Sequence, residues 1–257
     1  MLNKNNIPKL SVVIPAWKEA KRIGQSLEKL GKFLIDHEFG EVEVVVVVAD
    51  CPDATFEIAH SKSYLFEDYK VIQAGHRTGK GRDVRLAMKH AKGEYKLFMD
   101  ADLATPLHHL KTVLRLMEEE ADVIIGIRDL QSGHTGLRKI ISVAGNLLVR
   151  KVLRLDIKDT QCGFKAFRGP VADDLFGVQT INGWGFDMEL LAVAAERGYD
   201  IRTIPIHDWK DVEGGTFNNT AIRGAISTLK DLLTIKWNLV IGKYETTTDP
   251  APVLQET

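Results

Sequence analysis

The sequence predicts an α/β protein with a mainly parallel central sheet and helices on both faces. In the first half, short β-branched runs alternate with longer stretches whose apolar residues recur at helical spacing. The run VEVVVVVA (42–49) is apolar without alternation, as expected for a strand covered on both faces. Turn-forming glycine, proline and aspartate separate these runs. Strands that alternate with helices in this way pair in parallel.

The first half supplies the regular part of this pattern. We expect strands over residues 10–16, 42–49, 70–74, 95–100 and 121–128. We expect helices over residues 18–37, 54–66, 79–93 and 106–120. Thr105 and Pro106 predict the start of the last helix, as its N-cap and its first helical residue.

The second half is less regular. Residues 137–154 predict an amphipathic helix that carries five basic residues and no acid. Residues 159–168 fit a loop followed by a strand, 181–198 an aromatic loop leading into a helix, and 199–209 a late strand. Residues 221–244 predict a last helix with one apolar stripe, formed by Ile222, Ile226, Leu229, Leu233, Trp237 and Val240.

Composition excludes several classes of protein. The formal net charge of -1 gives no sign of a nucleic-acid-binding protein. The two cysteines, Cys51 and Cys162, lack metal-binding spacing and indicate a reducing compartment. No apolar run approaches the roughly 20 residues that span a bilayer, and the N-terminus shows no signal core. We expect a cytoplasmic protein. The helices at 137–154 and 221–244 fit both a peripheral position on a membrane and packing against the sheet.

Two aspartates follow the fourth predicted strand, in FMDADLATP. Ligands of parallel sheets bind beyond the carboxyl ends of the strands. In extended backbone, Asp100 and Asp102 point to the same side, where their charges repel unless a cation lies between them. Carboxylate oxygens suit Mg²⁺ or Mn²⁺. The alternative is that Asp102 forms an Asx turn and Asp100 only ends the strand.

The stretch HRTGKGRDV (76–84) fits a diphosphate site. Gly79 and Gly81 let the backbone approach a ligand, and Lys80 adds a cation at a helix N-terminus. An ordinary glycine turn explains the same residues. His76, like His108 and His109, shows no metal-binding grouping in the sequence.

In VVADCPDAT (47–55), Asp50 ends a buried strand on the same edge. Its carboxylate can accept an N–H from a base or bind a sugar hydroxyl. A turn built by Asp50, Pro52 and Asp53 is the equally good alternative.

These stretches carry a resemblance. SVVIPAWKEAKRI, VADCPDAT, TGKGRDVRLAM and MDADLATP resemble the motifs of family 2 glycosyltransferases, in that order. DTQCGFKAFR and GWGFDMELLAVAAERGY are similar to the branch of dolichyl-phosphate glucosyltransferases and mannose synthases. The resemblance implies the GT-A fold in a single domain over 1–245, with a nucleotide-binding half at about 8–128 and an acceptor half at about 129–245. Residues 246–257 are polar and expected to be disordered.

The resemblance also implies a donor site and a metal. Asp100 and Asp102 would hold Mg²⁺ or Mn²⁺, and Lys80 would lie by the diphosphate. Ala49 replaces a usual acid, which leaves one nucleoside contact open. Ala104 replaces a glutamine that is frequent in the mannose synthases, which favours UDP-glucose as donor. The expected donor-binding residues are Pro15, Ala16, Glu19, Asp50, Lys80, Gly81, Asp100 and Ala101.

The implied reaction is an inverting, metal-dependent transfer of a hexose, glucose from UDP-glucose, to a polyprenyl or dolichyl phosphate. A phosphate acceptor is already anionic, so it needs cations and no general base. The resemblance places it against Arg128, Arg138 and Ser142, although a solvated helix face explains Arg138 equally well. The catalytic candidates are Asp102, Arg128 and Asp187, the last of which would bind sugar hydroxyls or serve as a base.

Three alternatives stay open at this point. GDP-mannose could be the donor, or a soluble hydroxyl could be the acceptor. From another class, the chain could be a non-catalytic subunit that binds a nucleotide sugar and a membrane-protein partner. Ala49 is the feature that favours this last alternative.

Overall fold

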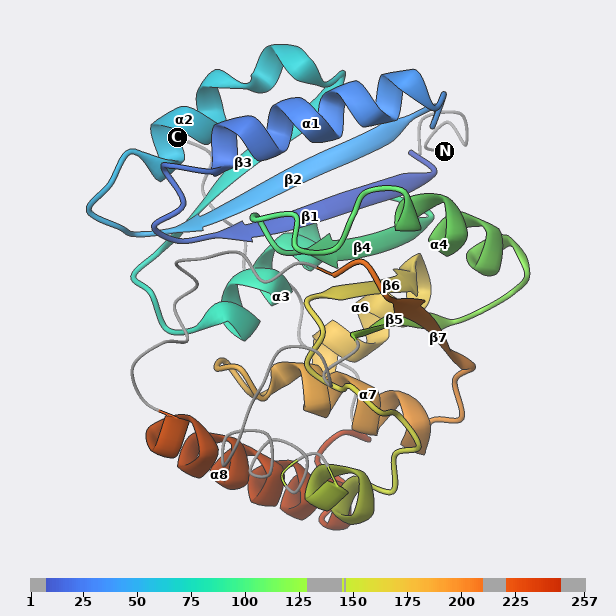
Figure 1. Ribbon diagram of the computed structural model, residues 1–257. Coiled ribbons are helices and arrows are strands. Elements are labelled where there is room, and N and C mark those ends of the chain that lie inside the picture. Colours follow the sequence, from blue (N-terminus) through green and yellow to red (C-terminus); the bar gives the residue numbers. More distant parts are fainter. Residues whose placement is uncertain (1–7, 129–144, 146, 210–220, 246–257) are drawn as a thin grey trace, which may run out of the picture.

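Seven strands form one sheet through the centre of the molecule, in the order β3-β2-β1-β4-β6-β5-β7 (Figure 1). The structure, a computed structural model, describes residues 8–128, 145, 147–209 and 221–245. The strands are β1 (Leu10–Ala16), β2 (Val42–Ala49), β3 (Asp68–Gly75), β4 (Tyr95–Met99), β5 (Val123–Arg128), β6 (Phe164–Arg168) and β7 (Ile201–Ile206). All neighbours pair in parallel except β6, which is antiparallel to both β4 and β5. The predicted α/β fold with a mainly parallel sheet is confirmed.

Helices flank the sheet and form a second layer at one end. They are α1 (Ile23–Asp36), α2 (Thr55–Ser61), α3 (Lys80–His90), α4 (His109–Glu118), α6 (Gly169–Val178), α7 (Phe186–Glu196) and α8 (Ala221–Val240), with a 3₁₀ turn η2 at Ser63–Leu65. In Figure 1, α7 lies between the sheet and α8, and α8 lies at the opposite end of the molecule from α1 and α2. In the part of the chain that the structure describes, no helix combines the length and apolarity needed to cross a membrane.

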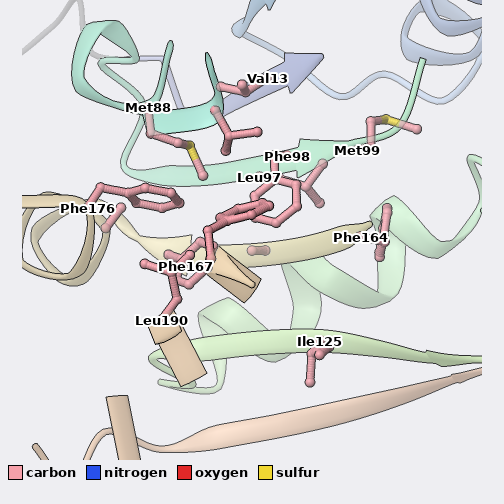
Figure 2. Close-up of a cluster of buried hydrophobic side chains, with 14 of the residues drawn as sticks. Val13, Met88, Leu97, Phe98, Met99, Ile125, Phe164, Phe167, Phe176 and Leu190 are labelled. Atoms are coloured by element: carbon pink, nitrogen blue, oxygen red, sulfur yellow. The ribbon is translucent and has the colours of Figure 1, made fainter. Parts of the chain in front are cut away.

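Aromatic residues fill the core where β4 and β6 meet the helices (Figure 2). The ring centre of Phe98 on β4 lies 5.6 Å from that of Phe186 on α7. Phe167 on β6 and Phe176 on α6 meet edge to face at 5.4 Å. This packing fixes β6 and α7 against β4, and both elements lead into the candidate site.

A buried carboxylate ties three strands together. Glu43 on β2 is fully buried and accepts hydrogen bonds from Ser11 Oγ (2.5 Å), Lys70 Nζ (3.0 Å) and the Lys92 backbone N–H (2.7 Å). Burial alone would raise the pKa of Glu43. The hydrogen bonds from Ser11, Lys92 and Lys70 outweigh burial and hold the pKa below its usual value.

Two helices begin later than the sequence predicts. Helix α1 starts at Ile23 instead of residue 18, because Lys18 has a positive φ of 58° and the Glu19 N–H bonds Thr55 Oγ at 2.8 Å. Helix α4 starts at His109, so Thr105 and Pro106 do not open it. The His109 N–H bonds the Pro106 carbonyl, which is 3₁₀-like spacing, and the turn at 106–108 therefore precedes the α-helix.

Other differences concern the second half of the chain. Helix α6 was not predicted; its sequence GPVADDLFGV carries a proline in the first turn, which is a usable start signal. Residues 147–153 are helical, while the rest of the predicted helix at 137–154 lies largely outside the described residues. The predicted tail at 246–257 lies outside them as well.

Candidate active site

The carboxyl edge of the sheet brings Lys80 and Asp100 together. Lys80 begins α3, Asp100 follows β4, and Lys80 Nζ lies 2.5 Å from Asp100 Oδ1. Burial lowers the pKa of Lys80, but the Asp100 and Asp187 carboxylates outweigh it and hold the pKa above its usual value. Lys80 is therefore a firmly charged cation at the N-terminus of a helix, where anions bind favourably.

Asp102 lies in the turn after β4. Its Oδ1 accepts the Ala104 N–H at 3.0 Å, so the Asx turn considered from the sequence is present. Burial, and then the neighbouring Asp100 charge, raises the pKa of Asp102. The aspartate both shapes the turn and adds negative charge beside Asp100.

Glu19 lies near enough to both aspartates for their charges to act on it. Its carboxylate is paired with Arg22, with Nε–Oε2 and Nη2–Oε1 distances of 2.7 and 3.0 Å. Burial raises the pKa of Glu19, Arg22 opposes the shift, and Asp102 and Asp100 add to it. The charges of both aspartates thus favour the protonated form of Glu19.

The two aspartates fit a hard divalent cation. A Cβ atom at Gly163 would lie 1.9 Å from Asp100 Oδ2, so the glycine makes room for this carboxylate. Their oxygens are the donors that Mg²⁺ and Mn²⁺ prefer. In the described ranges, no third histidine, cysteine or acid joins Asp100 and Asp102 in a metal-binding group. Phosphate and water would have to complete the coordination.

Arg128, at the end of β5, is clamped by Asp159. The guanidinium Nε and Nη2 donate to Asp159 Oδ2 and Oδ1 at 2.7 and 3.0 Å, and Arg128 lies 5.4 Å from the Trp209 ring centre. Burial alone would lower the pKa of Arg128, but Asp159 raises it, and Asp100 contributes. Asp159 was missed because it lies in a loop without periodicity. Arg138 and Ser142 lie outside the described residues.

Asp187 is buried in the first turn of α7. Its Oδ1 lies 2.5 Å from Nζ of Lys165, which is fully buried on β6 and also donates to the Cys162 carbonyl at 2.6 Å. Burial raises the pKa of Asp187, and the Lys165 and Lys80 ammonium groups counter it. Lys165 was not predicted as a site residue, although a lone lysine within the apolar strand FKAF is an informative signal.

The glycines of the GKG turn make room for the loop before α7. A Cβ atom at Gly79 would lie 2.3 Å from the Asn182 carbonyl oxygen, and one at Gly81 would lie 2.7 Å from Phe186 Cβ. Gly79 also has a positive φ of 143°. This packing brings the Trp184 ring centre within 5.2 Å of Lys80 Nζ. The glycines therefore have a packing role that the sequence analysis did not identify.

Asp50, which is exposed, borders a cavity of about 290 Å³ at the end of β2. The lining residues are Val48, Ala49, Asp50, Cys51, Asp53, Phe56, Glu57 and Gln73. Asp53 caps this turn, accepting from Thr55 Oγ at 2.7 Å and from the Ala20 N–H at 3.3 Å. The carbonyl of Asp50 accepts the Trp17 indole N–H at 3.2 Å, and the Arg77 guanidinium stacks 3.4 Å from the Trp17 ring centre.

The remaining predicted donor residues lie along the same edge. Pro15 and Ala16 end β1 beside β2, and Ala101 is buried in the turn between the two aspartates.

The structure also groups residues that the sequence did not connect. His108 and His109 both contact Asp208, beyond the end of β7, with Nε2–Oδ distances of 3.4 and 2.9 Å. Their ligand atoms lie within 4.8 Å of one another, so the structure brings these two histidines and Asp208 into a group that could hold a metal ion, which was not expected from the sequence. No local pattern marks this group, because Asp208 is distant in the chain from both histidines.

Residues 11–176 match the family model described as "Glycosyl transferase family 2". The chain belongs to this glycosyltransferase family. The enzyme is 32% identical over 222 residues to a dolichyl-phosphate beta-glucosyltransferase of Drosophila melanogaster, covering 80% of this chain and 68% of the relative. It is 29% identical over 240 residues to dolichyl-phosphate beta-glucosyltransferase ALG5D of Trichomonas vaginalis, covering 88% of this chain and 72% of the relative.

Solved structures confirm the fold of this glycosyltransferase. It superposes with a TM-score of 0.66 and 18% identity on glucosyl-3-phosphoglycerate synthase from Mycobacterium tuberculosis, crystallised with Mn²⁺, UDP and phosphoglyceric acid. The match covers 89% of this chain and 78% of the synthase. The predicted GT-A fold is therefore correct.

Proposed function

We propose that this glycosyltransferase moves glucose from UDP-glucose to a polyprenyl or dolichyl phosphate. One observation carries the proposal: Asp100 pairs with Lys80, and its charge also acts on Arg128, a cation from another part of the chain. Lys80 contacts it at 2.5 Å, and Asp100 also contributes to the raised pKa of Arg128. The reaction needs one cation for the leaving diphosphate and another for the acceptor phosphate, and this arrangement supplies both.

Lys80 would bind the leaving diphosphate. As the bond between the anomeric carbon and the diphosphate oxygen breaks, negative charge grows on UDP, which leaves with the electron pair. An ammonium whose side chain is only 11% exposed stabilises that charge strongly, because little water screens it. Asp100 and Asp102 would hold Mg²⁺ or Mn²⁺, which when bound supplies Lewis-acid stabilisation of the same group.

Arg128 would hold the acceptor phosphate in line. A phosphate oxygen then forms the new bond to the anomeric carbon from the face opposite UDP, which inverts the configuration. Asp159 fixes the guanidinium of Arg128 by two hydrogen bonds, so its orientation is set before the acceptor arrives. Arg138 and Ser142 would complete this acceptor site.

A general base is unnecessary when the acceptor is an anion. Glu189 is unsuited to act as one, because it is fully buried and accepts hydrogen bonds from Thr180, Ile181 and Tyr244. Asp187 would instead bind sugar hydroxyls in its ionised form. The names of the relatives support the lipid phosphate as acceptor, over a soluble hydroxyl.

The nucleotide would bind along the ends of β1, β2 and α3. The cavity beside Asp50 and the neighbouring Trp17 support a position for the base there. Pro15, Ala16, Glu19, Gly81 and Ala101 would complete the donor site. Ala104 supports UDP-glucose over GDP-mannose, because its side chain offers no further metal ligand.

The test offers both donors to the same protein. The purified chain is incubated with labelled UDP-glucose or GDP-mannose and a polyprenyl phosphate, with Mn²⁺ or with a chelator, and glycolipid is separated from water-soluble label. We expect glucolipid from UDP-glucose with Mn²⁺. Product from GDP-mannose alone would refute the donor, and no lipid product from either would refute the acceptor.

A variant pair tests the acceptor cation. Arg128→Met should raise the KM for the polyprenyl phosphate by at least about tenfold, because a charged hydrogen bond to phosphate is lost. Arg115→Met, at an exposed ion pair on α4, is the matched control and should leave the KM unchanged. An unchanged KM in the Arg128 variant would remove it from the acceptor site.

A further inference from the structure

Helix α8 has apolar residues on two opposite faces. Leu232 and Ile235 are buried on the inner face, which packs towards α7. The outer face leaves Leu233, Trp237 and Val240 exposed by 60%, 64% and 67%. A surface helix of a globular domain normally needs only the first apolar stripe. The exposed apolar stripe on the outer face therefore indicates a binding partner outside the chain.

The exposed apolar residues are concentrated here. Ten large apolar side chains are exposed in the described residues, and five belong to α8 and the residue that follows it. These five are Leu229, Leu233, Trp237, Val240 and Ile241. At 100° per residue they all fall on one side of the helix. Part of the stripe borders an apolar hollow of about 460 Å³.

Lysines border this stripe on both sides. At helical spacing, Lys230 falls along one edge and Lys236 along the other, and Lys243 extends the second edge beyond the helix. Asp231 points the other way, towards the backbone of Gly185. An apolar stripe with a tryptophan, bordered by lysines and free of acids, matches the headgroup region of an anionic bilayer.

We propose that the outer face of α8 docks on a lipid bilayer that contains anionic headgroups. Leu229, Leu233, Trp237, Val240 and Ile241 would insert among the upper acyl chains, and the three lysines would reach the headgroups. The charge pattern favours a bilayer over a second copy of the chain, because a second copy would bring the same lysines face to face.

Helix α8, whose outer face is the docking face, contacts the loop beside the candidate active site with its inner face. A Cβ atom at Gly185 would lie 2.5 Å from Asp231 Oδ2, so α8 packs directly on the loop that carries Trp184. The Trp184 ring centre in turn lies 5.2 Å from Lys80 Nζ. A lipid phosphate at this bilayer surface would lie close to that site, and in this respect the inference rests on the proposed function.

Vesicle co-sedimentation of the full chain tests the docking face without turnover. We expect binding to vesicles of phosphatidylcholine with phosphatidylglycerol, and weaker binding to phosphatidylcholine alone. Leu233→Ser combined with Trp237→Ser should lower the partition coefficient at least about tenfold, because two large apolar side chains no longer insert. Ile35→Ser on α1, where the side chain is 73% exposed, is the matched control and should bind normally.

Charge reversal tests the lysines separately. Lys236→Glu with Lys243→Glu should lower binding to the anionic vesicles at least about fivefold. Absence of vesicle binding, equal loss in the Ile35 variant, or a wild-type dimer in light scattering that dissociates in the Trp237 variant would each overturn the proposal.

A short-chain, water-soluble polyprenyl phosphate separates this inference from the proposed function. The double variant at Leu233 and Trp237 should transfer glucose to it as fast as the wild type. If the wild type binds vesicles but transfers no sugar to either acceptor, the proposed function fails and the docking face stands.

Discussion

The Lys80 ammonium and the Asp100 carboxylate lie 2.5 Å apart, although the two residues belong to different elements and are separated by 20 positions. In the absence of substrate the pair neutralises both charges. A diphosphate at the α3 N-terminus would compete for the ammonium, and a divalent cation would compete for the carboxylate. On the proposed function, the pair therefore holds both groups at the place where these ligands would bind.

The first prediction concerns Lys80. Lys80→Met should lower kcat for glucose transfer by about 10²–10³-fold, because the leaving diphosphate loses a preorganised cation. Initial rates with labelled UDP-glucose check this. Lys89→Met, on the same helix but away from the carboxyl edge, is the control. A Lys80 variant within a few-fold of wild type would exclude the leaving-group role.

The second prediction uses the close approach of Gly163 to Asp100. In Gly163→Ala the new Cβ would lie 1.9 Å from Asp100 Oδ2, so the carboxylate must move. We expect Mn²⁺ affinity, measured by calorimetry, to fall at least about tenfold. Gly177→Ala has nothing within 4 Å and should leave Mn²⁺ binding unchanged. Wild-type Mn²⁺ affinity in the Gly163 variant would contradict the metal site.

The third prediction concerns the buried pair of Lys165 and Asp187. Lys165→Met should reduce the free energy of unfolding by about 3–5 kcal/mol, because Asp187 is left as an uncompensated buried charge. Lys165→Met with Asp187→Leu should recover most of the loss, since an apolar pair needs no partner charge. Urea unfolding measures both. Additive losses in the double variant would show that the two residues are not coupled.

The fourth prediction concerns the pH dependence that Glu43 confers. Its pKa is lowered in the folded state, so the ionised carboxylate stabilises the fold above the unfolded value of 4.5. This contribution is lost as pH falls through the folded pKa. Glu43→Gln should therefore destabilise the protein by about 1–3 kcal/mol at about pH 7, and by much less at about pH 3.5. Exposed Glu57→Gln is the control, and an equal loss at both pH values would contradict the prediction.

The fifth prediction concerns Asp83, whose ionised form destabilises the fold, whereas ionised Glu43 stabilises it. Burial raises the pKa of Asp83 on α3 to about 6, with Arg82 and Arg77 countering it, and Asp83 Oδ1 has no hydrogen-bond partner. The ionised group therefore destabilises the fold, by an amount that grows from pH 3.8 and is complete above about pH 6. Asp83→Asn should stabilise the protein by up to about 3 kcal/mol at about pH 7.5, and hardly at about pH 4. Equal stabilisation at both pH values would refute this.

Local patterns in the sequence were sufficient to predict most of the sheet. The strands β1 and β2 have the predicted ends, because turn residues bound each β-branched run and so define where the strand begins and ends. The direction of β6 was not predicted, because strand direction depends on contacts distant in the chain. The start of α4 was also wrong, because proline suits the first residue of a 3₁₀ turn as well as that of an α-helix.

Only those residues of the candidate site that lie at the ends of strands were predicted from the sequence. Asp100 and Lys80 meet because the βαβ order places both at the carboxyl edge of the sheet: Asp100 directly follows β4, and Lys80 begins the helix after β3. The residues that hold the site in place were missed, namely Asp159 beside Arg128 and Lys165 beside Asp187. Each partner is supplied by a segment distant in sequence, and no local periodicity marks such a pair.

Because β6 is antiparallel, the geometry of the candidate site depends on the register of this strand. Because β6 runs against β4, its beginning lies where the other strands end, with Phe164 opposite Met99. Gly163 reaches Asp100 for that reason. A slip of β6 by a single residue would turn Lys165 to the opposite face, away from Asp187, and would place a residue with a Cβ against Asp100. An error in strand pairing would thus damage the proposed donor and sugar sites at once, so on this proposal correct pairing of β6 is a condition for activity as well as for folding.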